Sequence, residues 1–508
     1  DQMIEIDGDH LRIEDVIAVA RNFEKVCIKA DAKKKIEESR KIVEKIIEEE
    51  RTVYGVSTGF GDLVRVRINR KDVDTLQQNL VRSHSCGHGK LLPTDLVRAM
   101  MLLRANSLVK GYSGVRYELV ELLVGMLNNR IHPCIPESGS VGASGDLIPL
   151  AHIALAVIGE GEVEVDGEIV GADEGLKRKG LKPIKLKAKE GLALINGTQL
   201  MNAYLCFAIH DIHNLLKNAQ IAGIMSLEAL KGTDQAFRKD IQKLRPHEGQ
   251  KKSAENLWNL LRGSEILKSH RDCPKVQDPY TLRCMPQVFG TVYDALDFAR
   301  KIAEVEMNSV TDNPIILRES GDVVSGGNFH GQNLAMVLDF LSIATSYLGS
   351  FSERRIARLV DSKLSELPPF LTDKGGLHSG FMMPHYLAAS LVNENKILSH
   401  PASVDTIPVS ANQEDFVSMG ANAGKKLMKI IDNVQTIIAI EYLASAQALE
   451  FLKPLKPSRA IQIAFNHIRK RIQKLDVDRA MYRDIEMMKN MVKSGEIVRA
   501  VEKEVKLH

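Results

Sequence analysis

The sequence contains little cysteine, and none of it is paired. Six cysteines are spread over 508 residues, and no two of them form a CxxC motif. Sparse, unpaired cysteines favour free thiols in a reducing cytoplasm over a disulfide framework. A metal role for them is disfavoured as well, because paired spacing is missing. We therefore expect a cytoplasmic protein without a metal centre.

Long apolar runs and an excess of one charge are also missing. No uninterrupted run reaches the roughly 18 apolar residues of a membrane-spanning helix. The stretch DQMIEIDGDH has neither the basic nor the apolar segment of a secretory signal. The 68 lysines and arginines nearly balance the 65 aspartates and glutamates, which gives a net charge of +3. This balance gives no reason to expect nucleic acid or a membrane as a partner.

Helical periodicity is what the sequence has instead. Residues 31–55 place an apolar stripe between lysines and glutamates, as an amphipathic helix does. A second helix is predicted over 94–110, with Thr94 as its N-cap and Gly111 as its stop. Residues 115–128 predict a third helix, which the sequence IHPCIP ends.

The strongest helical signal lies in the C-terminal half. Apolar residues between Leu427 and Ile438 follow the i, i+3, i+4, i+7 spacing of one helix face. From Val434 to Leu452 the chain is apolar on nearly every side. Such a helix is expected inside a bundle or against another subunit, because no face suits water.

Signals for β-structure are short and few. Alternation on both sides of Asp166-Gly167 predicts a hairpin over 162–170, and a small hairpin is predicted near 314–327. The stretch MIEIDGDHLRI reads as a hairpin that turns at Asp7-Gly8. No internal repeat or low-complexity linker is visible. We predict a mainly α protein, with a smaller mixed N-terminal part (residues 1–110) on a large helical bundle (residues 111–508).

The stretch SVGASGDLIPLAH, which begins at Ser140, places an Ala-Ser-Gly triplet before an apolar run. It does not fit a nucleophile elbow, because Asp146 stands where that motif needs its last glycine. It lacks the lysine of a phosphate-binding loop. A plain helix start, with Ser144 or Asp146 as the cap, fits the local pattern. However, three glycines within seven residues exceed what a cap requires. The buried start of an apolar helix carries positive partial charge, which suits an electrophile or an anion.

The motif GSVGASGDLIPLAH resembles the signature of the aromatic amino-acid lyases, the family of the histidine and phenylalanine ammonia-lyases. The resemblance extends from about Tyr54 to the YRDIE segment at 482–486. It implies a fold of the fumarase/aspartase-like superfamily of helical lyases. It also implies that Ala143, Ser144 and Gly145 cyclise by themselves into 4-methylidene-imidazol-5-one (MIO), so that no dissociable cofactor is needed. In that chemistry the Gly145 nitrogen attacks the Ala143 carbonyl, and Ser144 loses water.

Further blocks carry the remaining site residues that the resemblance implies. In YGVSTGFG, Tyr54 corresponds to a catalytic acid/base on a mobile loop, and in VQDPYTLRCMPQVFG, Tyr280 is the second candidate proton carrier. Tyr280 and Arg283 are three residues apart and are expected on one face of a helical turn. The guanidinium of Arg283 suits a carboxylate, which it can bind with two hydrogen bonds. The expected substrate-binding residues are His84, Asn196, Gln277, Arg283, Phe329, Gln413 and Glu414.

The substrate is inferred from a few of these residues. The resemblance implies the elimination of ammonia from an L-amino acid. His84 indicates a polar ring, and Glu414 can pair with an imidazole, which favours L-histidine and the product trans-urocanate. Phe416 departs from this pattern, because histidine lyases usually have histidine there. The segment RSHSCG also resembles tyrosine enzymes slightly more.

Other activities stay open at this point. A tyrosine ammonia-lyase or a tyrosine 2,3-aminomutase would use the same electrophile. A fumarase/aspartase-type enzyme is disfavoured, because its GSSxMPxKxN-like loop is missing. A non-enzymatic helical assembly protein would leave the site residues unexplained. The resemblance further implies a homotetramer with shared active sites, for which the all-apolar helix at 434–452 offers a surface.

Overall fold

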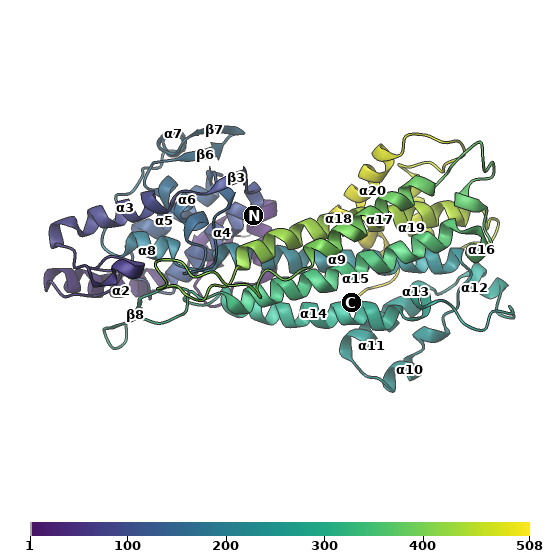
Figure 1. Cartoon of the computed structure of the whole chain (residues 1–508), viewed down its shortest axis with the longest axis horizontal. Coiled ribbons are helices and arrows are strands. Elements are labelled where there is room, and N and C mark those ends of the chain that lie inside the picture. The colour runs from purple at the N-terminus through teal and green to yellow at the C-terminus, as the bar shows by residue number, and fades with distance from the viewer. Residues whose placement is uncertain (1–2) are drawn as a thin grey trace. The chain divides into compact units, whose positions relative to one another are not determined.

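The computed structural model describes residues 3–508, and its chain forms two compact units. Within the described residues, the first unit comprises residues 3–207, 300–339 and 401–425. The second comprises residues 208–299, 340–400 and 426–508. Figure 1 shows the predominance of helix in both. The predicted mainly α fold is confirmed.

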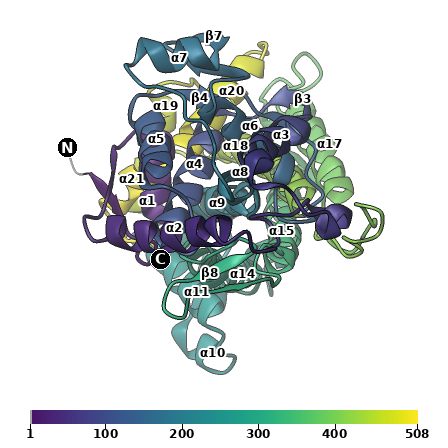
Figure 2. The same cartoon turned by 90° about the vertical axis from the view of Figure 1, so that its left-hand side faces the viewer.

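The first unit combines short helices with four small sheets. Helix α4 (Thr94–Val109) is buried along its whole length from Leu96 and packs against α1 (Ile13–Asn22) and α5 (Tyr117–Asn128), as Figure 2 allows one to follow. The other helices and strands of the first unit are β1 (Ile4–Ile6), β2 (Val26–Ile28), α2 (Ala32–Glu48), α3 (Val73–His84), β3 (His88–Leu91), β4 (His132–Pro133), β5 (Pro136–Ser138), α6 (Leu147–Val157), β6 (Glu162–Val165), β7 (Glu168–Gly171), α7 (Ala172–Arg178), α8 (Glu190–Ile195), β8 (Ile315–Leu317) and β9 (Asp322–Val324).

Two of the three predicted hairpins form. Strands β6 and β7 pair antiparallel around Asp166-Gly167, and β8 pairs antiparallel with β9. The predicted hairpin at Asp7-Gly8 is wrong, because β1 pairs in parallel with β2 instead. A parallel pair needs a crossover, and helix α1 supplies it. The alternation in the sequence therefore identified a strand but not its partner.

The predicted cap of one helix is wrong, and that of another is confirmed in its position only. Thr94 is the first residue of α4, Pro93 holds the N-cap position, and the Thr94 hydroxyl donates to Glu164 at 2.9 Å. Asp146 does hold the N-cap position of α6, but its side chain does not cap that helix. Both side chains are used in contacts between elements, which local sequence patterns do not reveal.

The second unit is a bundle of long helices. Four long helices contribute most of their length to this unit: α9 (Gln199–Ala229), α14 (Met285–Glu306), α15 (Gln332–Val360) and α18 (Gly420–Glu450). Within the unit these helices lie side by side (Figure 1). Each of these four helices also contributes residues to the first unit. The remaining helices are α10 (Lys239–Lys243), α11 (Glu248–Leu260), α12 (Glu265–Ser269), α13 (Tyr280–Arg283), α16 (Ser362–Ser365), α17 (Met382–Leu398), α19 (Arg459–Arg469), α20 (Tyr482–Ser494) and α21 (Glu496–Glu502).

Helix α18 is covered by its own chain. Almost every residue from Val434 to Leu449 is buried. A buried ion pair between Arg355 of α15 and Glu441 of α18, at 2.7 Å, lies in the same core. The all-apolar stretch is therefore explained within the bundle, and it gives no separate reason to expect a partner subunit.

Helix α15 is the one helix of the described residues that is long and apolar enough to cross a membrane by length and composition. Inside the protein, 61% of that stretch is buried. Burial of this kind is typical of a core helix in a bundle.

The two compact units do not follow the boundary expected at residue 110. Helices α4 and α5 lie on either side of that position and pack together within the first unit. The first unit is assembled from three separate stretches of chain. A single cut in the sequence cannot describe such a unit.

Candidate active site

The Ala-Ser-Gly triplet lies between β5 and α6, in a tight backbone turn. A β-bridge joins Ala143 to Gly145, and a second one joins Gly145 to Gly197. The Asp146 N–H donates to the Gly197 carbonyl at 2.7 Å. At Gly145, φ is +75°, and a Cβ there would collide with the Gly197 backbone. Only glycine fits this position, because an L side chain would clash and would strain the left-handed backbone.

Asp146 holds the start of α6 in place through two side-chain hydrogen bonds. Its carboxylate accepts hydrogen bonds from the Ser140 hydroxyl at 2.7 Å and from the Met201 N–H at 2.9 Å. The side chain is wholly buried, and this burial raises the pKa of Asp146 to about 6. Both carboxylate oxygens are thus engaged away from the Ser144 side chain.

Glu414 reaches the triplet from a distant part of the sequence. The Ser144 hydroxyl donates to Glu414 Oε1 at 2.8 Å. The segment 409–414 folds back on itself, and the backbones of Val409 and Glu414 exchange hydrogen bonds of 3.0 and 3.2 Å. Three consecutive non-glycine residues, 410–412, have φ of +54°, +51° and +69°. Such strain persists only where the surroundings impose it, and it is common at functional sites.

Tyr54 lies on the loop that the sequence assigned to it. Its ring makes an edge contact with Phe60, with centroids 6.4 Å apart. Burial raises the pKa of the Tyr54 hydroxyl, a hydrogen bond from the Gly61 backbone lowers it, and the charges of Glu414 and Asp312 raise it again. The net upward direction is opposite to what a phenolate base requires. Within this unit, Tyr54 is a neutral phenol that can donate a proton.

His84 is the last residue of α3. Its Nδ1 lies 3.0 Å from the Ser83 hydroxyl. Burial lowers the pKa of His84, whereas the Leu80 backbone and the charge of Glu414 act in the opposite direction. A neutral imidazole can donate from one nitrogen and accept at the other. The charge of Glu414 thus acts on both Tyr54 and His84.

Asn196 directly follows α8, at its C-cap position, and is buried. Its side-chain amide donates to the Asn313 carbonyl at 2.9 Å, and its own backbone carbonyl accepts from Arg104 at 3.1 Å. Its side-chain oxygen Oδ1 has no hydrogen-bond partner in the protein. A buried acceptor without a partner costs free energy, so it invites a donor from a bound molecule.

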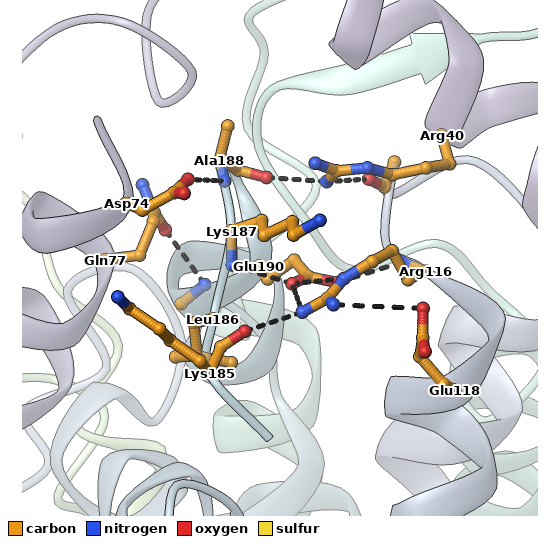
Figure 3. Close-up of polar contacts among 12 residues, drawn as sticks. Arg40, Asp74, Gln77, Arg116, Glu118, Lys185, Leu186, Lys187, Ala188 and Glu190 are labelled. Atoms are coloured by element: carbon orange, nitrogen blue, oxygen red, sulfur yellow. Dashed lines mark hydrogen bonds and ion pairs between the residues drawn. The ribbon is translucent and has the colours of Figure 1, made fainter. Parts of the chain in front are cut away.

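The segment that leads into α8, residues 185–190, is held by side chains of α2, of α3 and of the N-cap residue of α5 (Figure 3). Arg116 binds the buried carboxylate of Glu190 at 2.6 Å and the Lys185 carbonyl at 2.7 Å. Arg40 donates to the Ala188 carbonyl at 2.8 Å, and Asp74 accepts from the Ala188 N–H at 3.1 Å. These contacts fix the origin of α8, and through this helix they fix the position of Asn196.

A buried ion pair lies at the same place, and sequence reasoning missed it. Lys189 Nζ and Asp312 Oδ2 are 2.6 Å apart, and both side chains are 0% exposed. Asp312 also accepts from the Asn313 N–H at 2.7 Å, and Asn313 is the residue that binds Asn196. Lys189 lies in a lysine-rich stretch, where nothing in the sequence distinguishes it from its exposed neighbours.

Phe329 and Gln413 stand nearer the surface of the first unit. Phe329 is half-buried in the turn that follows β9, and Gln413 is exposed in the 409–414 turn. Phe416, the departure from the histidine-lyase pattern, stacks on His330 with centroids 6.1 Å apart. His330 Nε2 also lies 3.0 Å from the Phe416 carbonyl. Phe416 therefore has a packing role of its own.

Gln277, Tyr280 and Arg283 belong to the second unit. Gln277 is exposed, and Tyr280 is 68% exposed. The guanidinium carbon of Arg283 lies 4.7 Å from the centre of the Tyr280 ring, and its Nε donates to the Asp278 carbonyl at 2.9 Å. The expected shared face of Tyr280 and Arg283 is confirmed. The site residues thus fall into two groups, one in each unit.

Comparisons with known proteins define the class. A family model described as aromatic amino acid lyase matches residues 11–470. A histidine ammonia-lyase of Alkaliphilus oremlandii is 49% identical over 504 residues, covering 99% of both chains. The chain therefore belongs to the aromatic amino acid lyase family, and it is a carbon–nitrogen lyase of the ammonia-lyase type.

Two solved structures are similar over nearly the whole chain. The histidine ammonia-lyase of Trypanosoma cruzi has a TM-score of 0.92 and 38% identity, covering 99% of this chain and 96% of its own. The tyrosine aminomutase of Streptomyces globisporus has a TM-score of 0.95 and 37% identity, with complete coverage of both chains. The fold is thus common to lyases and aminomutases.

Proposed function

We propose that this protein eliminates ammonia from L-histidine and releases trans-urocanate. The observation that carries the proposal is the hydrogen bond between Ser144 and Glu414, beside His84 and Tyr54. Full-length similarity to histidine ammonia-lyases at 49% identity supports the same substrate. The solved structures do not separate the two activities, since the histidine ammonia-lyase is 38% identical and the tyrosine aminomutase 37%.

The triplet is suited to become MIO. The turn that bridges Ala143 and Gly145 brings together the two residues whose backbones must join. Gly145 has the conformational freedom and the space that its neighbours would deny any other residue. The group would supply an electrophile at the start of α6, where the helix dipole favours electron withdrawal.

The residues of the first unit have distinct tasks in this proposal. His84 and Glu414 hold the two nitrogens of the imidazole ring, since a neutral histidine and a carboxylate offer complementary partners. The free Oδ1 of Asn196 accepts an N–H of the substrate amine. Tyr54 delivers a proton, because its raised pKa keeps it protonated.

The residues of the second unit complete the site. Arg283 grips the substrate carboxylate with its planar guanidinium, and Gln277 assists it. Tyr280 is the second proton carrier. From the resemblance to the aromatic amino-acid lyases, we propose that the active sites are shared between subunits of a homotetramer. A fully active monomer in sedimentation experiments would contradict that assembly.

The function is tested by product analysis. The purified protein is incubated in turn with L-histidine, L-tyrosine and L-phenylalanine, and new ultraviolet absorption is followed while the products are identified. We expect trans-urocanate from L-histidine and little turnover of the other two. A β-amino acid from L-tyrosine would establish the aminomutase instead. We expect the protein to act in the cytoplasm.

A further inference from the structure

The Ser144 hydroxyl has one carboxylate as its hydrogen-bond partner. Ser144 Oγ donates to Glu414 Oε1 at 2.8 Å. Asp146 is the nearest acid in sequence, but its two carboxylate oxygens accept hydrogen bonds from the Ser140 hydroxyl and the Met201 N–H. The Glu414 carboxylate therefore contacts the Ser144 hydroxyl that would leave as water.

From this geometry we infer that Glu414 is the proton shuttle that dehydrates Ser144 during maturation of the triplet. The inference rests on the proposed function, because it assumes that MIO forms. It gives Glu414 a task that comes before any contact with substrate. General acid–base catalysis by a positioned side chain accelerates such proton transfers by about 10²–10⁴-fold.

Two water molecules leave, and the atoms balance as follows. In the first step the Gly145 nitrogen bonds to the Ala143 carbonyl carbon. The Ala143 carbonyl oxygen leaves as water with the amide hydrogens of Ser144 and Gly145. In the second step the Glu414 carboxylate takes the Cα proton of Ser144 and passes it to Oγ. The Cβ–Oγ bond breaks, Cα and Cβ become doubly bonded, water leaves, and Glu414 is a carboxylate again.

The 409–414 turn explains why this carboxylate is available. The left-handed residues 410–412 bend the chain so that Val409 and Glu414 pair, and this fixes the backbone from which the Glu414 side chain extends. The Ser410 hydroxyl accepts from the Asp62 N–H at 3.2 Å, which ties the turn to the segment that follows the Tyr54 loop. The turn therefore sets the position of Glu414 before substrate arrives.

The experiment follows the mass of the protein after refolding. Wild type should become lighter by two waters, roughly 36 Da. Glu414→Gln removes the shuttle but keeps the size of the side chain. It should retain the water of Ser144, with its loss slowed by about 10²-fold or more. Fragment masses of the peptide that contains residues 143–145 identify which water remains.

A matched control separates chemistry from charge and from folding. Asp415 is the exposed neighbour of Glu414 on the same segment. Asp415→Asn makes the same change of charge and should mature at the wild-type rate. Glu414→Asp retains a carboxylate and should mature at an intermediate rate. If Glu414→Gln does not fold, Glu414→Ala refolded with and without acetate replaces it, and acetate should restore the loss of water.

The outcomes distinguish this inference from the proposed function. Loss of both waters by Glu414→Gln at the wild-type rate overturns the inference and leaves MIO in place. Equal retardation of Asp415→Asn overturns it too, since the effect would then be one of charge. An active wild type that keeps its full mass overturns both MIO and the shuttle.

Discussion

The two groups of site residues are held in very different ways. In the first unit, Asn196, Ala143 and Gly145 are buried and Ser144 is half-buried. The chain leading to Asn196 is fixed by Arg40, Asp74 and Arg116. In the second unit, Tyr280 is 68% exposed, and Arg283 is fixed through one backbone carbonyl and a ring. The unit that holds the triplet is thus preorganised by its own chain, whereas the unit that holds Arg283, the proposed carboxylate-binding residue, presents its groups at a surface.

This difference agrees with the chemistry that we propose for each unit. Cyclisation of the triplet needs atoms held within a fraction of an ångström before any substrate is present. Binding of a substrate carboxylate gains its geometry when substrate and neighbouring surface arrive. Substitutions in the first group should therefore alter maturation or folding. Substitutions in the second group should alter turnover of a protein that has matured.

The largest expected effect comes from the triplet. Ser144→Ala removes the hydroxyl whose loss makes the electrophile, so activity should be abolished while the fold is retained. Intact mass and circular dichroism, measured beside the activity, check both halves of this expectation. Measurable wild-type turnover by this variant would remove the triplet from the mechanism.

The next largest effect is expected at the buried Lys189–Asp312 ion pair. Lys189→Met leaves Asp312 charged, buried and without its partner, which should lower the free energy of unfolding by about 3–5 kcal/mol. Lys187 is exposed on the same segment, so Lys187→Met should change stability by no more than about 0.5 kcal/mol. Denaturant titration of both variants compares them. Equal shifts would show that the pair is not what fixes this segment.

Lys189 also shows where sequence reasoning stopped. The helices, two hairpins, and the residues of the triplet and of the 54–61 loop follow local patterns of periodicity, turns and spacing. The Lys189–Asp312 pair joins positions 123 residues apart, and the Ser144–Glu414 bond joins positions 270 apart. No local pattern records such contacts. The same reason explains why the partner of β1 was wrongly predicted and why Thr94 and Asp146 serve elsewhere instead of capping.

In the second unit, the buried carboxyl group of Glu228 should make the stability of the protein depend on pH. Glu228 of α9 accepts from the Ser264 hydroxyl and the Ser458 N–H, and one of its oxygens is buried without a partner. Burial raises the pKa of Glu228 to about 7. Its folded pKa lies above its unfolded value, so its contribution to stability is complete below about pH 4.5 and is lost as pH rises through about 7.

Glu228→Gln should remove that dependence. Between pH 5 and pH 8, the free energy of unfolding of the variant should rise relative to that of wild type by up to about 3 kcal/mol. This is the free energy of a pKa shift of this size. Thermal melting at both pH values measures it, with the exposed Glu486→Gln as control. A variant whose pH dependence matches wild type would show that Glu228 is not the group that titrates.

Arg283→Lys tests the exposed half directly. Lysine keeps the charge but loses the planar fork that binds a carboxylate with two hydrogen bonds. We expect kcat/KM for L-histidine to fall by the factor that corresponds to a loss of about 1.5–3 kcal/mol of transition-state stabilisation. The mass of the matured protein should stay that of wild type. A maturation defect in this variant would break the division of tasks between the two units.

The smallest expected effect is at Phe416. The ring stacks on His330 and is 60% exposed, so it packs against a neighbour at the surface. Phe416→His replaces one aromatic ring with another and should change stability by no more than about 1.5 kcal/mol, the range of such pairs. If His84 and Glu414 select the imidazole, the ratio of kcat/KM for L-histidine to that for L-tyrosine should change less than about tenfold, within the same free energy. Competition between the two substrates in one assay measures this ratio directly. A much larger rise in preference for L-histidine would show that position 416, rather than Glu414, recognises the ring.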